Sequence, residues 1–164
     1  MVAKRIELLQ QMPIFGAIDA GTLEFLLAAA PVVRIPRGGF YFREGDPPSG
    51  MFVLEQGRVA VSKNWNAHAL LLQRMGPGDC FGEMALLDLF PRSASVRAEE
   101  DCSAIELSSA NLYRLFERDV AQFALIQMNI AREMSRRLRL TDEALFRARM
   151  GEALDRPEAL RHDD

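Results

Sequence analysis

The chain has 164 residues and a formal net charge of −3 at neutral pH, with 49% hydrophobic and 26% charged residues. This length fits one domain around a single core, and the acidic balance excludes a general attraction to nucleic acid or to an anionic membrane surface. No apolar run reaches the roughly 20 residues that span a bilayer, and the N-terminus lacks a signal-peptide core, so we expect a soluble, cytoplasmic protein.

Two helices are expected at the N-terminus, within residues 4–30. Segment 3–12 spaces its apolar residues as an amphipathic helix does, and Pro13 interrupts the pattern. A second helix is expected from Asp19, a residue type that caps helices, to a stop before Pro31. The chain therefore begins with helical structure.

Residues 32–108 have a different texture, because eight glycines separate short runs rich in Val, Phe, Leu and Ile. This pattern predicts an antiparallel β-roll or jelly-roll barrel, and with the flanking helices the fold class is α+β. The alternation on either side of Gly57 predicts a hairpin, and residues 64–68 look like the tip of the next hairpin, with Trp65 exposed in it.

The cysteines and histidines form no recognisable site. Cys80 and Cys102 lie in apolar, strand-like segments without a second pair, so we expect reduced core residues. His68 and His162 stand alone, without the neighbours that a metal or nucleophilic centre needs. We therefore predict no metal ligands and no catalytic residues.

The C-terminal part, residues 109–150, is expected to be helical, with a long helix from about residue 120 and a polar tail over 151–164. One stripe of this helix is spaced by four, three, four and three residues, as in the seam of a coiled coil. The stripe predicts a homodimer, and the alternative is that it packs on the protein's own barrel. Its members are Met134, Leu138, Thr141, Leu145 and Ala148.

The segment 81–96, FGEMALLDLFPRSASV, combines a glycine, an acid, a short apolar run and a base. Gly82 permits close approach of a ligand, and a helical turn from Glu83 to about Leu87 would direct free N–H groups toward an anion. The guanidinium of Arg92 can hold phosphate oxygens in two places, while a carboxylate can accept from a ribose hydroxyl. A simple ion pair between Glu83 and Arg92 is the alternative.

The order of helices, glycine-punctuated barrel, this segment and a long terminal helix resembles the cyclic nucleotide-binding domain family. The resemblance covers about residues 8–145 and includes FREGDPPSGMFVLEQGRVAV and GPGDCFGE. It implies one such domain over residues 1–150. It also implies that Glu83 accepts from the ribose 2′-hydroxyl, that Arg92 holds the cyclic phosphate, and that Ser93 and Ala94 supply a hydroxyl and backbone N–H groups.

Within the family, the chain most resembles the sensor domain of the bacterial catabolite activator and other Crp–Fnr type regulators. RRLRLTDE at 136–143 matches the part of the dimer helix that closes over adenine, although Asp142 replaces a small hydroxyl residue. Val61 and Leu72 match positions that line the nucleotide pocket, and either is equally compatible with a plain core position. The implied ligand-binding residues are Phe81, Gly82, Glu83, Met84, Ala85, Arg92, Ser93, Ala94, Val61, Leu72, Arg137 and Thr141.

We therefore expect a non-enzymatic, dimeric sensor of cAMP that signals through its C-terminal helix to an unknown downstream protein. The alternatives are a module for cGMP or a cyclic dinucleotide, a ligand-free structural dimerisation domain, and a fragment of a longer regulator, channel or transporter. Only 23 residues follow Thr141, whereas a winged helix-turn-helix needs more than about 50, so we expect no nucleic-acid binding by this chain itself.

Overall fold

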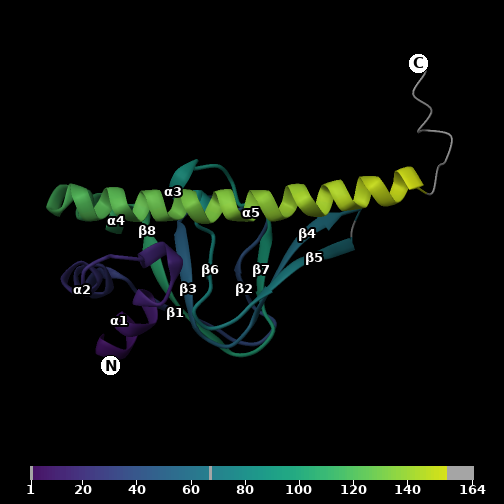
Figure 1. Cartoon of the computed structure of the whole chain (residues 1–164). Coiled ribbons are helices and arrows are strands. Elements are labelled where there is room, and N and C mark those ends of the chain that lie inside the picture. The colour runs from purple at the N-terminus through teal and green to yellow at the C-terminus, as the bar shows by residue number, and fades with distance from the viewer. Residues whose placement is uncertain (1, 67, 155–164) are drawn as a thin grey trace, which may run out of the picture.

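Two sheets form a β-roll that lies against one long helix. The structure is a computed structural model that describes residues 2–66 and 68–154. Helix α5 (Val120–Leu154) runs along one side of the roll, and the N-terminal helices lie at one end, below the first half of α5 (Figure 1). The predicted α+β fold class, with its antiparallel roll and its long C-terminal helix, is confirmed.

The strands nest in the manner of a jelly roll, because β1 pairs with β8, β2 with β7, β3 with β6 and β4 with β5. One sheet has the order β1–β8–β3–β6 and the other β2–β7–β4–β5, and each pairing is antiparallel. The strands are β1 (Val32–Ile35), β2 (Phe40–Phe42), β3 (Gly50–Gln56), β4 (Val59–Trp65), β5 (His68–Met75), β6 (Cys80–Phe81), β7 (Ser95–Ala98) and β8 (Cys102–Ser108).

The N-terminal helices follow the predicted pattern with small shifts. Helix α1 (Val2–Gln10) ends before the predicted limit, because a separate 3₁₀ turn, η1 (Pro13–Phe15), takes over at the proline. Helix α2 (Ala20–Ala29) begins where predicted, since the Asp19 carboxylate accepts from the backbone N–H of Thr22 at 2.7 Å. Their apolar faces join the core between the first sheet and the helices.

The hairpin predicted at Gly57 is wrong, whereas the next hairpin is confirmed. Strands β3 and β4 belong to different sheets, so the chain crosses from one sheet to the other at Gly57 instead of pairing with itself. The glycine has φ +86°, and an added Cβ would lie 2.5 Å from the Cys102 sulfur, so the crossing needs a glycine. In the β4–β5 hairpin Val59 pairs with Met75 at one end and Trp65 with His68 at the other, so Trp65 ends β4 directly before the turn.

Two apolar clusters hold these elements together. One fills the roll between the sheets and includes Phe52, Leu54 and Phe81, and the other packs helices on the first sheet. Cys80 and Cys102 are both buried free thiols, so their predicted core positions are confirmed. Burial, with a smaller contribution from Glu83, raises the pKa of the Cys80 thiol to about 12.

The C-terminal helices place the predicted seam beside the roll. Helix α4 (Ser109–Arg118) begins with a capping box at Ser108, and α5 extends four residues past the predicted end. Met134 packs on the protein's own core, but Leu138 and Leu145 are 61% and 51% exposed, so self-packing does not account for the whole stripe. Residues 155–164, which hold His162 and most of the predicted polar tail, lie outside the described residues.

Candidate functional site

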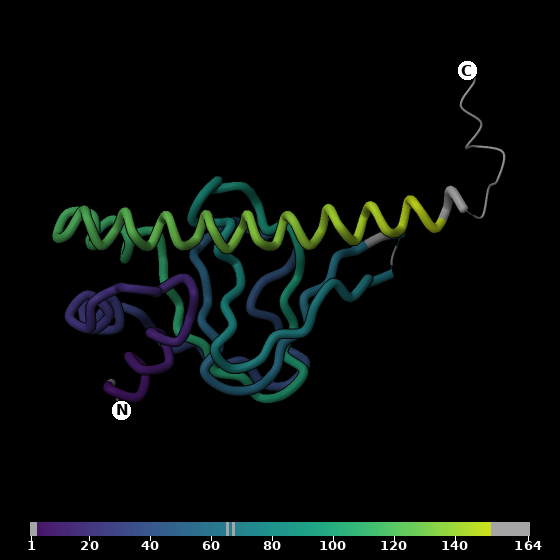
Figure 2. The backbone as a smooth tube through the Cα atoms, viewed as in Figure 1, coloured from purple at the N-terminus to yellow at the C-terminus, as the bar shows by residue number. Residues whose placement is uncertain are grey.

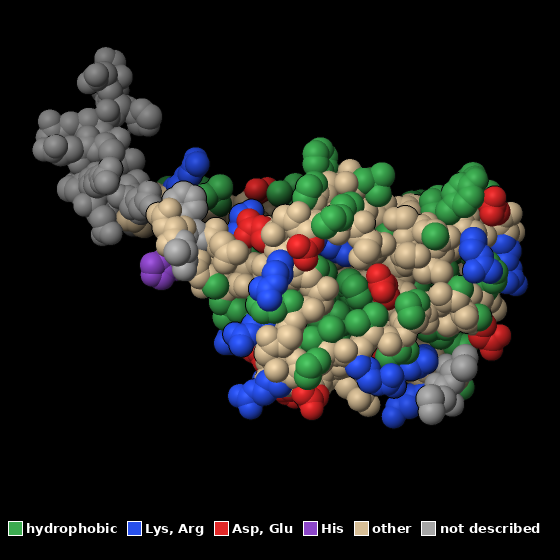
Figure 3. Space-filling view, turned by 180° about the vertical axis from the view of Figure 1, so that it is seen from behind, with side chains coloured by type: hydrophobic (Ala, Val, Ile, Leu, Met, Phe, Trp, Pro, Cys, Tyr) green, Lys and Arg blue, Asp and Glu red, His purple; other side chains and the backbone are tan. Residues whose placement is uncertain are grey.

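A cavity of about 1180 Å³ opens between the roll and the middle of α5, from Glu133 to Ala144. The β4–β5 hairpin extends from the roll toward the C-terminal half of this helix (Figure 2). In the view from behind, hydrophobic side chains lie exposed in the middle of the molecular face, with basic and acidic side chains around them (Figure 3). The structure brings all twelve predicted residues to the cavity wall: Val61, Leu72, Phe81, Gly82, Glu83, Met84, Ala85, Arg92, Ser93, Ala94, Arg137 and Thr141.

The floor of the cavity is built around Gly82, where the chain leaves β6 and enters the short helix α3 (Met84–Leu87). Gly82 has φ +78°, a conformation that L residues rarely adopt. An added Cβ would lie 2.7 Å from Nη1 of Arg92 and 3.1 Å from the Phe42 ring. A glycine is therefore needed here both for the backbone conformation and to leave space for the Arg92 guanidinium.

Arg92 is a buried cation that forms no ion pair with a carboxylate among residues 2–66 and 68–154. Only 5% of the residue is exposed, and its Nη1 and Nη2 donate to the Gly82 carbonyl at 3.1 Å and the Ser49 hydroxyl at 3.0 Å. Its guanidinium lies 4.0 Å from the centre of the Phe42 ring, and its Nε is buried without a hydrogen-bond partner among the described residues. Burial lowers the pKa of Arg92 and outweighs the opposing charges of Glu106, Asp46 and Glu83, so these carboxylates only partly offset the cost of burying the cation.

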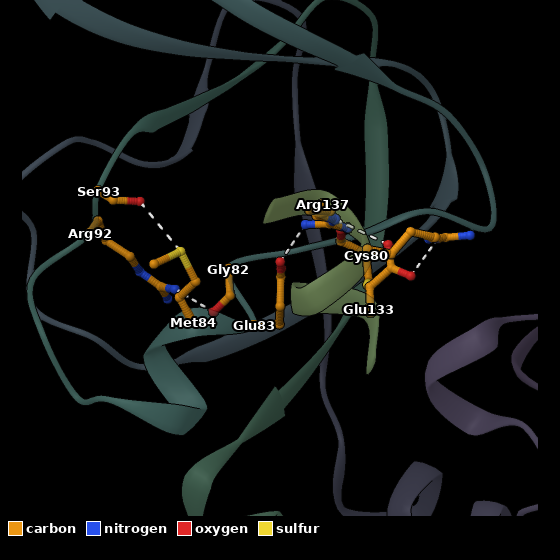
Figure 4. A network of polar contacts seen from close by, with 9 residues as sticks. Cys80, Gly82, Glu83, Met84, Arg92, Ser93, Glu133 and Arg137 are labelled. Atoms are coloured by element: carbon orange, nitrogen blue, oxygen red, sulfur yellow. Dashed lines mark hydrogen bonds and ion pairs between the residues drawn. The ribbon is translucent and has the colours of Figure 1, made fainter. Parts of the chain in front are cut away.

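Glu83 does not pair with Arg92, so the simple ion pair considered from the sequence is wrong. The carboxylate, 3% exposed, accepts instead from Nη1 of Arg137 on α5. Figure 4 shows Arg137 turned toward Glu83 while Arg92 reaches the Gly82 carbonyl. Burial raises the pKa of Glu83 and outweighs the opposing attraction of Arg137. Glu83 and Arg92 therefore both line the cavity, and each has a different partner within the protein.

Arg137 connects α5 to the floor of the cavity. Its Nε donates to Glu133 at 3.1 Å, and its Nη2 makes a long contact of 3.4 Å with the Cys80 carbonyl. Glu133 is 8% exposed and also pairs with Arg136. Burial alone would raise the pKa of Glu133, but the hydrogen bonds and charges of the two arginines lower it. The sequence placed Arg137 over the base, whereas its contacts here are with carboxylates.

Other predicted residues line the wall with varied exposure. Leu72 is 54% exposed, so it is not a plain core residue, while Val61 both lines the cavity and packs on the roll core. The Thr141 hydroxyl donates to the Arg137 carbonyl at 3.0 Å, and the exposed Ser93 hydroxyl lies 3.9 Å from the Met84 sulfur. Each hydroxyl oxygen keeps free acceptor capacity.

The sequence reasoning missed several wall residues. Those on α5 recur at helical spacing beside the predicted seam, so the signal was present but was assigned to the dimer stripe alone. Those near the roll follow only from the tertiary structure. The missed residues include Glu133, Arg136, Leu140 and Ala144 from α5, and Phe42, Gln73, Asp88 and Phe90 from the roll side.

The described ranges, 2–66 and 68–154, contain neither a metal-binding cluster nor a membrane-spanning helix. No group of three His, Cys, Asp or Glu side chains in these ranges is placed to hold a metal ion. No helix in them is long and apolar enough to cross a membrane.

Comparison with known proteins places this geometry in context. The profile described as "Cyclic nucleotide-binding domain" matches residues 32–119. The chain is 28% identical over 140 residues to the CRP-like cAMP-activated global transcriptional regulator of Mycobacterium tuberculosis, covering 85% of this chain and 61% of that protein.

Two solved structures are similar. The catabolite activator protein of Thermus thermophilus has a TM-score of 0.76 at 30% identity, covering 86% of this chain and 65% of that one. The c-di-GMP responsive global regulator CLP of Xanthomonas campestris has a TM-score of 0.67 at 30% identity, covering 79% and 64%. The chain thus spans less than two thirds of the length of these relatives.

Proposed function

The chain belongs to the cyclic nucleotide-binding domain family, and from this we propose that it is a cytoplasmic, non-enzymatic sensor whose ligand is cAMP. Binding in the cavity changes the position of α5, which carries the signal to a downstream protein. The cAMP-activated regulator that the chain resembles supports the choice of ligand. The contacts of α5 with the cavity floor support the route of the signal, because a ligand at Glu83 must rearrange the ion pair with Arg137.

The observation that carries the proposal is the state of Arg92. A buried guanidinium with no carboxylate within ion-pair distance, among the described residues, is costly unless an anion completes the site. A cyclic phosphate carries one negative charge and presents oxygens to which Arg92 can donate. The apolar side chains of Phe42 and Met84 line the cavity beside Arg92, and a bound nucleotide would displace water there, which would strengthen that interaction.

The remaining wall residues receive the rest of the nucleotide. Glu83 accepts from a ribose hydroxyl, and Ser93 and Ala94 supply a hydroxyl and a backbone N–H beside the phosphate. The apolar side chains of the β4–β5 hairpin and of Leu140 cover the base, and the Thr141 hydroxyl accepts from the exocyclic amine of adenine. The cavity therefore holds matched groups for phosphate, sugar and base.

The active form is a parallel homodimer joined along α5. The exposed Leu138 and Leu145 lie one heptad apart, with Thr141 between them, and a second copy would bury both leucines. Because the two-fold axis runs beside the cavity wall, movement of one α5 helix is felt by the other subunit. Contact between the two α5 helices thus provides a route for signalling between the subunits.

A second candidate ligand is a cyclic dinucleotide. The similarity to the c-di-GMP responsive regulator favours it, since that protein matches this chain as closely in identity as the catabolite activator protein does. Both ligands share the anionic phosphate that Arg92 requires. They differ in the base and in the number of phosphates, so direct titration separates them.

The test is to identify the nucleotide that the purified protein carries or accepts. Mass spectrometry of the ligand released on denaturation, followed by thermal unfolding with added cAMP, cGMP and cyclic di-GMP, covers the candidates. We expect cAMP to raise the midpoint of unfolding most, because only a ligand that binds the native state stabilises it. A larger shift with cGMP or cyclic di-GMP would identify that nucleotide as the ligand instead of cAMP. No shift with any of the three would favour a structural dimerisation domain without a ligand.

A further inference from the structure

Helix α5 has two adjacent faces that differ in exposure to solvent. One face, including Ile130, Glu133 and Arg137, is buried or half-buried against the protein's own domain. The neighbouring face carries Leu138 and Leu145, which are largely exposed in the single chain. At 3.6 residues per turn the two faces meet along one edge of the helix, so a second copy on the exposed face comes close to the cavity.

The heptad register fixes which side chains flank that second copy. With Leu138 and Leu145 at a positions and Thr141 at a d position, Arg137 occupies g and Asp142 occupies e. In a parallel two-stranded coiled coil, a g residue lies beside the e residue five positions further along the other helix. The g position of Arg137 therefore lies opposite Asp142 of the second copy, and the two charges are complementary.

The contacts within one chain leave both groups able to form this pair. The Arg137 side chain is 32% exposed, and its Nη2 has only the long 3.4 Å contact to the Cys80 carbonyl. A guanidinium has five N–H donors, so its outer edge has donors to spare. Asp142 is exposed and forms no ion pair among the described residues, unlike the next acid, Glu143, which pairs with Arg147 of its own helix.

Resting on the parallel dimer proposed above, we infer that the partner subunit's Asp142 pairs with Arg137 and so forms part of the ligand site in trans. Arg137 is then shared by Glu83, Glu133 and the partner subunit's Asp142. The third carboxylate draws the guanidinium outward and loosens its hold on Glu83. The Glu83 carboxylate becomes available to a ligand hydroxyl only when the second subunit is in place.

The inferred pair predicts a change in cAMP affinity opposite to the one expected from long-range electrostatics alone. An acid near the site of an anionic ligand should weaken binding through long-range repulsion, so its neutralisation should strengthen binding. The inferred pair has the opposite effect, because loss of the partner subunit's Asp142 returns Arg137 fully to Glu83. Asp142→Asn should therefore weaken cAMP binding about threefold to tenfold, although it removes a negative charge.

The first measurement needs no ligand. Sedimentation equilibrium of the wild-type protein, Asp142→Asn, Asp142→Glu and the matched control Glu143→Gln gives the dimer dissociation constant of each. We expect Asp142→Asn to raise this constant about threefold to tenfold, since a two-fold dimer loses two pairs, while the other two variants stay close to wild type. Equal constants for Asp142→Asn and wild type, or a wild-type protein that stays monomeric, would overturn the inference.

The second measurement asks in which subunit Asp142 acts. Differently tagged chains are co-expressed and purified as heterodimers in which Arg92→Ala disables one of the two sites. When Asp142→Asn lies on the chain with the intact site, cAMP affinity should equal that of the heterodimer without it, because the partner still supplies Asp142. When Asp142→Asn lies on the Arg92→Ala chain, affinity at the intact site should fall about threefold to tenfold.

The reverse pattern, or the same affinity in both heterodimers, would overturn the action in trans. Failure of the cAMP proposal is distinguishable from failure of this inference. If the wild-type dimer binds no cAMP, the ligand proposal fails, whereas the dissociation constants of the ligand-free variants still decide whether Arg137 and the partner subunit's Asp142 pair.

Discussion

Replacing Arg92 by methionine should separate two effects of this residue. One is the folding stability lost by burying its charge, and the other is the affinity gained for an anionic ligand. Without ligand, Arg92 donates to two neutral acceptors and lies over Phe42, and no carboxylate among the described residues forms an ion pair with it. The charges of Glu106, Asp46 and Glu83 offset its burial only in part, since the pKa of Arg92 is still lowered. Burying an unpaired ion costs several kcal/mol, which is comparable to the gain from those contacts. Ser49 is exposed, so water replaces the lost donor there, and the methionine fills the space beside Phe42.

We therefore expect the unfolding free energy of ligand-free Arg92→Met to equal that of the wild type or to exceed it by up to about 2 kcal/mol. The loss of cAMP affinity should be about 2 to 5 kcal/mol, as for removal of one partner of a desolvated charge pair. The stability of the ligand-free protein is thus kept or raised while its affinity for cAMP falls. A residue that served only the fold would show a loss of stability without an effect specific to the ligand.

Denaturant unfolding with and without cAMP measures both effects on one sample. At a concentration about 100 times the dissociation constant, cAMP should stabilise the wild type by about 2.7 kcal/mol and the variant not at all. Arg43→Met is the matched control, because the Arg43 guanidinium also lies over a phenylalanine ring, at 3.8 Å from Phe40, but outside the cavity. A ligand-free Arg92→Met less stable than wild type by more than about 2 kcal/mol would refute the reasoning, as would full stabilisation of the variant by cAMP.

Three other changes test separate parts of the site. Gly82→Ala should abolish cAMP binding in a calorimetric titration and destabilise the fold by at least about 1 kcal/mol, because its Cβ would displace the Arg92 guanidinium. Near-wild-type binding would show that Arg92 does not need this position to bind the ligand. Glu133→Gln should lower the unfolding free energy by about 1 to 3 kcal/mol at neutral pH. Because the folded-state pKa of Glu133 is lowered, this difference should be present above its ordinary value near 4.5 and vanish as pH falls through the lower folded-state pKa; a difference independent of pH would contradict the assigned pairs. Thr141→Val should lower cAMP affinity by about 0.5 to 1.5 kcal/mol and cGMP affinity less, with the dimer intact in light scattering, and an unchanged cAMP to cGMP ratio would mean that the base is read elsewhere.

The fold was largely predictable because its signals are local. Asp19 caps α2 through its own side chain, and five of the eight glycines within residues 32–108 have positive φ. The hairpin at Gly57 could not be excluded from the sequence, because alternation reports which face of a strand is buried and not which strand pairs with it. The crossing between sheets is set by contact with Cys102, far along the chain.

The site was predictable where one segment supplies it and was missed where distant elements meet. Gly82, Glu83 and Arg92 lie in a single motif, so their type and spacing were informative. The partner of Glu83 is 54 residues away on α5, and its helical pattern is the same whether it faces a carboxylate or a base. Only the packing of α5 on the roll shows that Arg137 serves Glu83.

The most direct test of the central claim is a calorimetric titration of the wild-type protein with cAMP, cGMP and cyclic di-GMP under identical conditions. The account predicts one cAMP bound per chain, with a dissociation constant on the order of a micromolar or lower and weaker binding of the two guanine nucleotides. The absence of heat and of any thermal stabilisation at millimolar cAMP would contradict it.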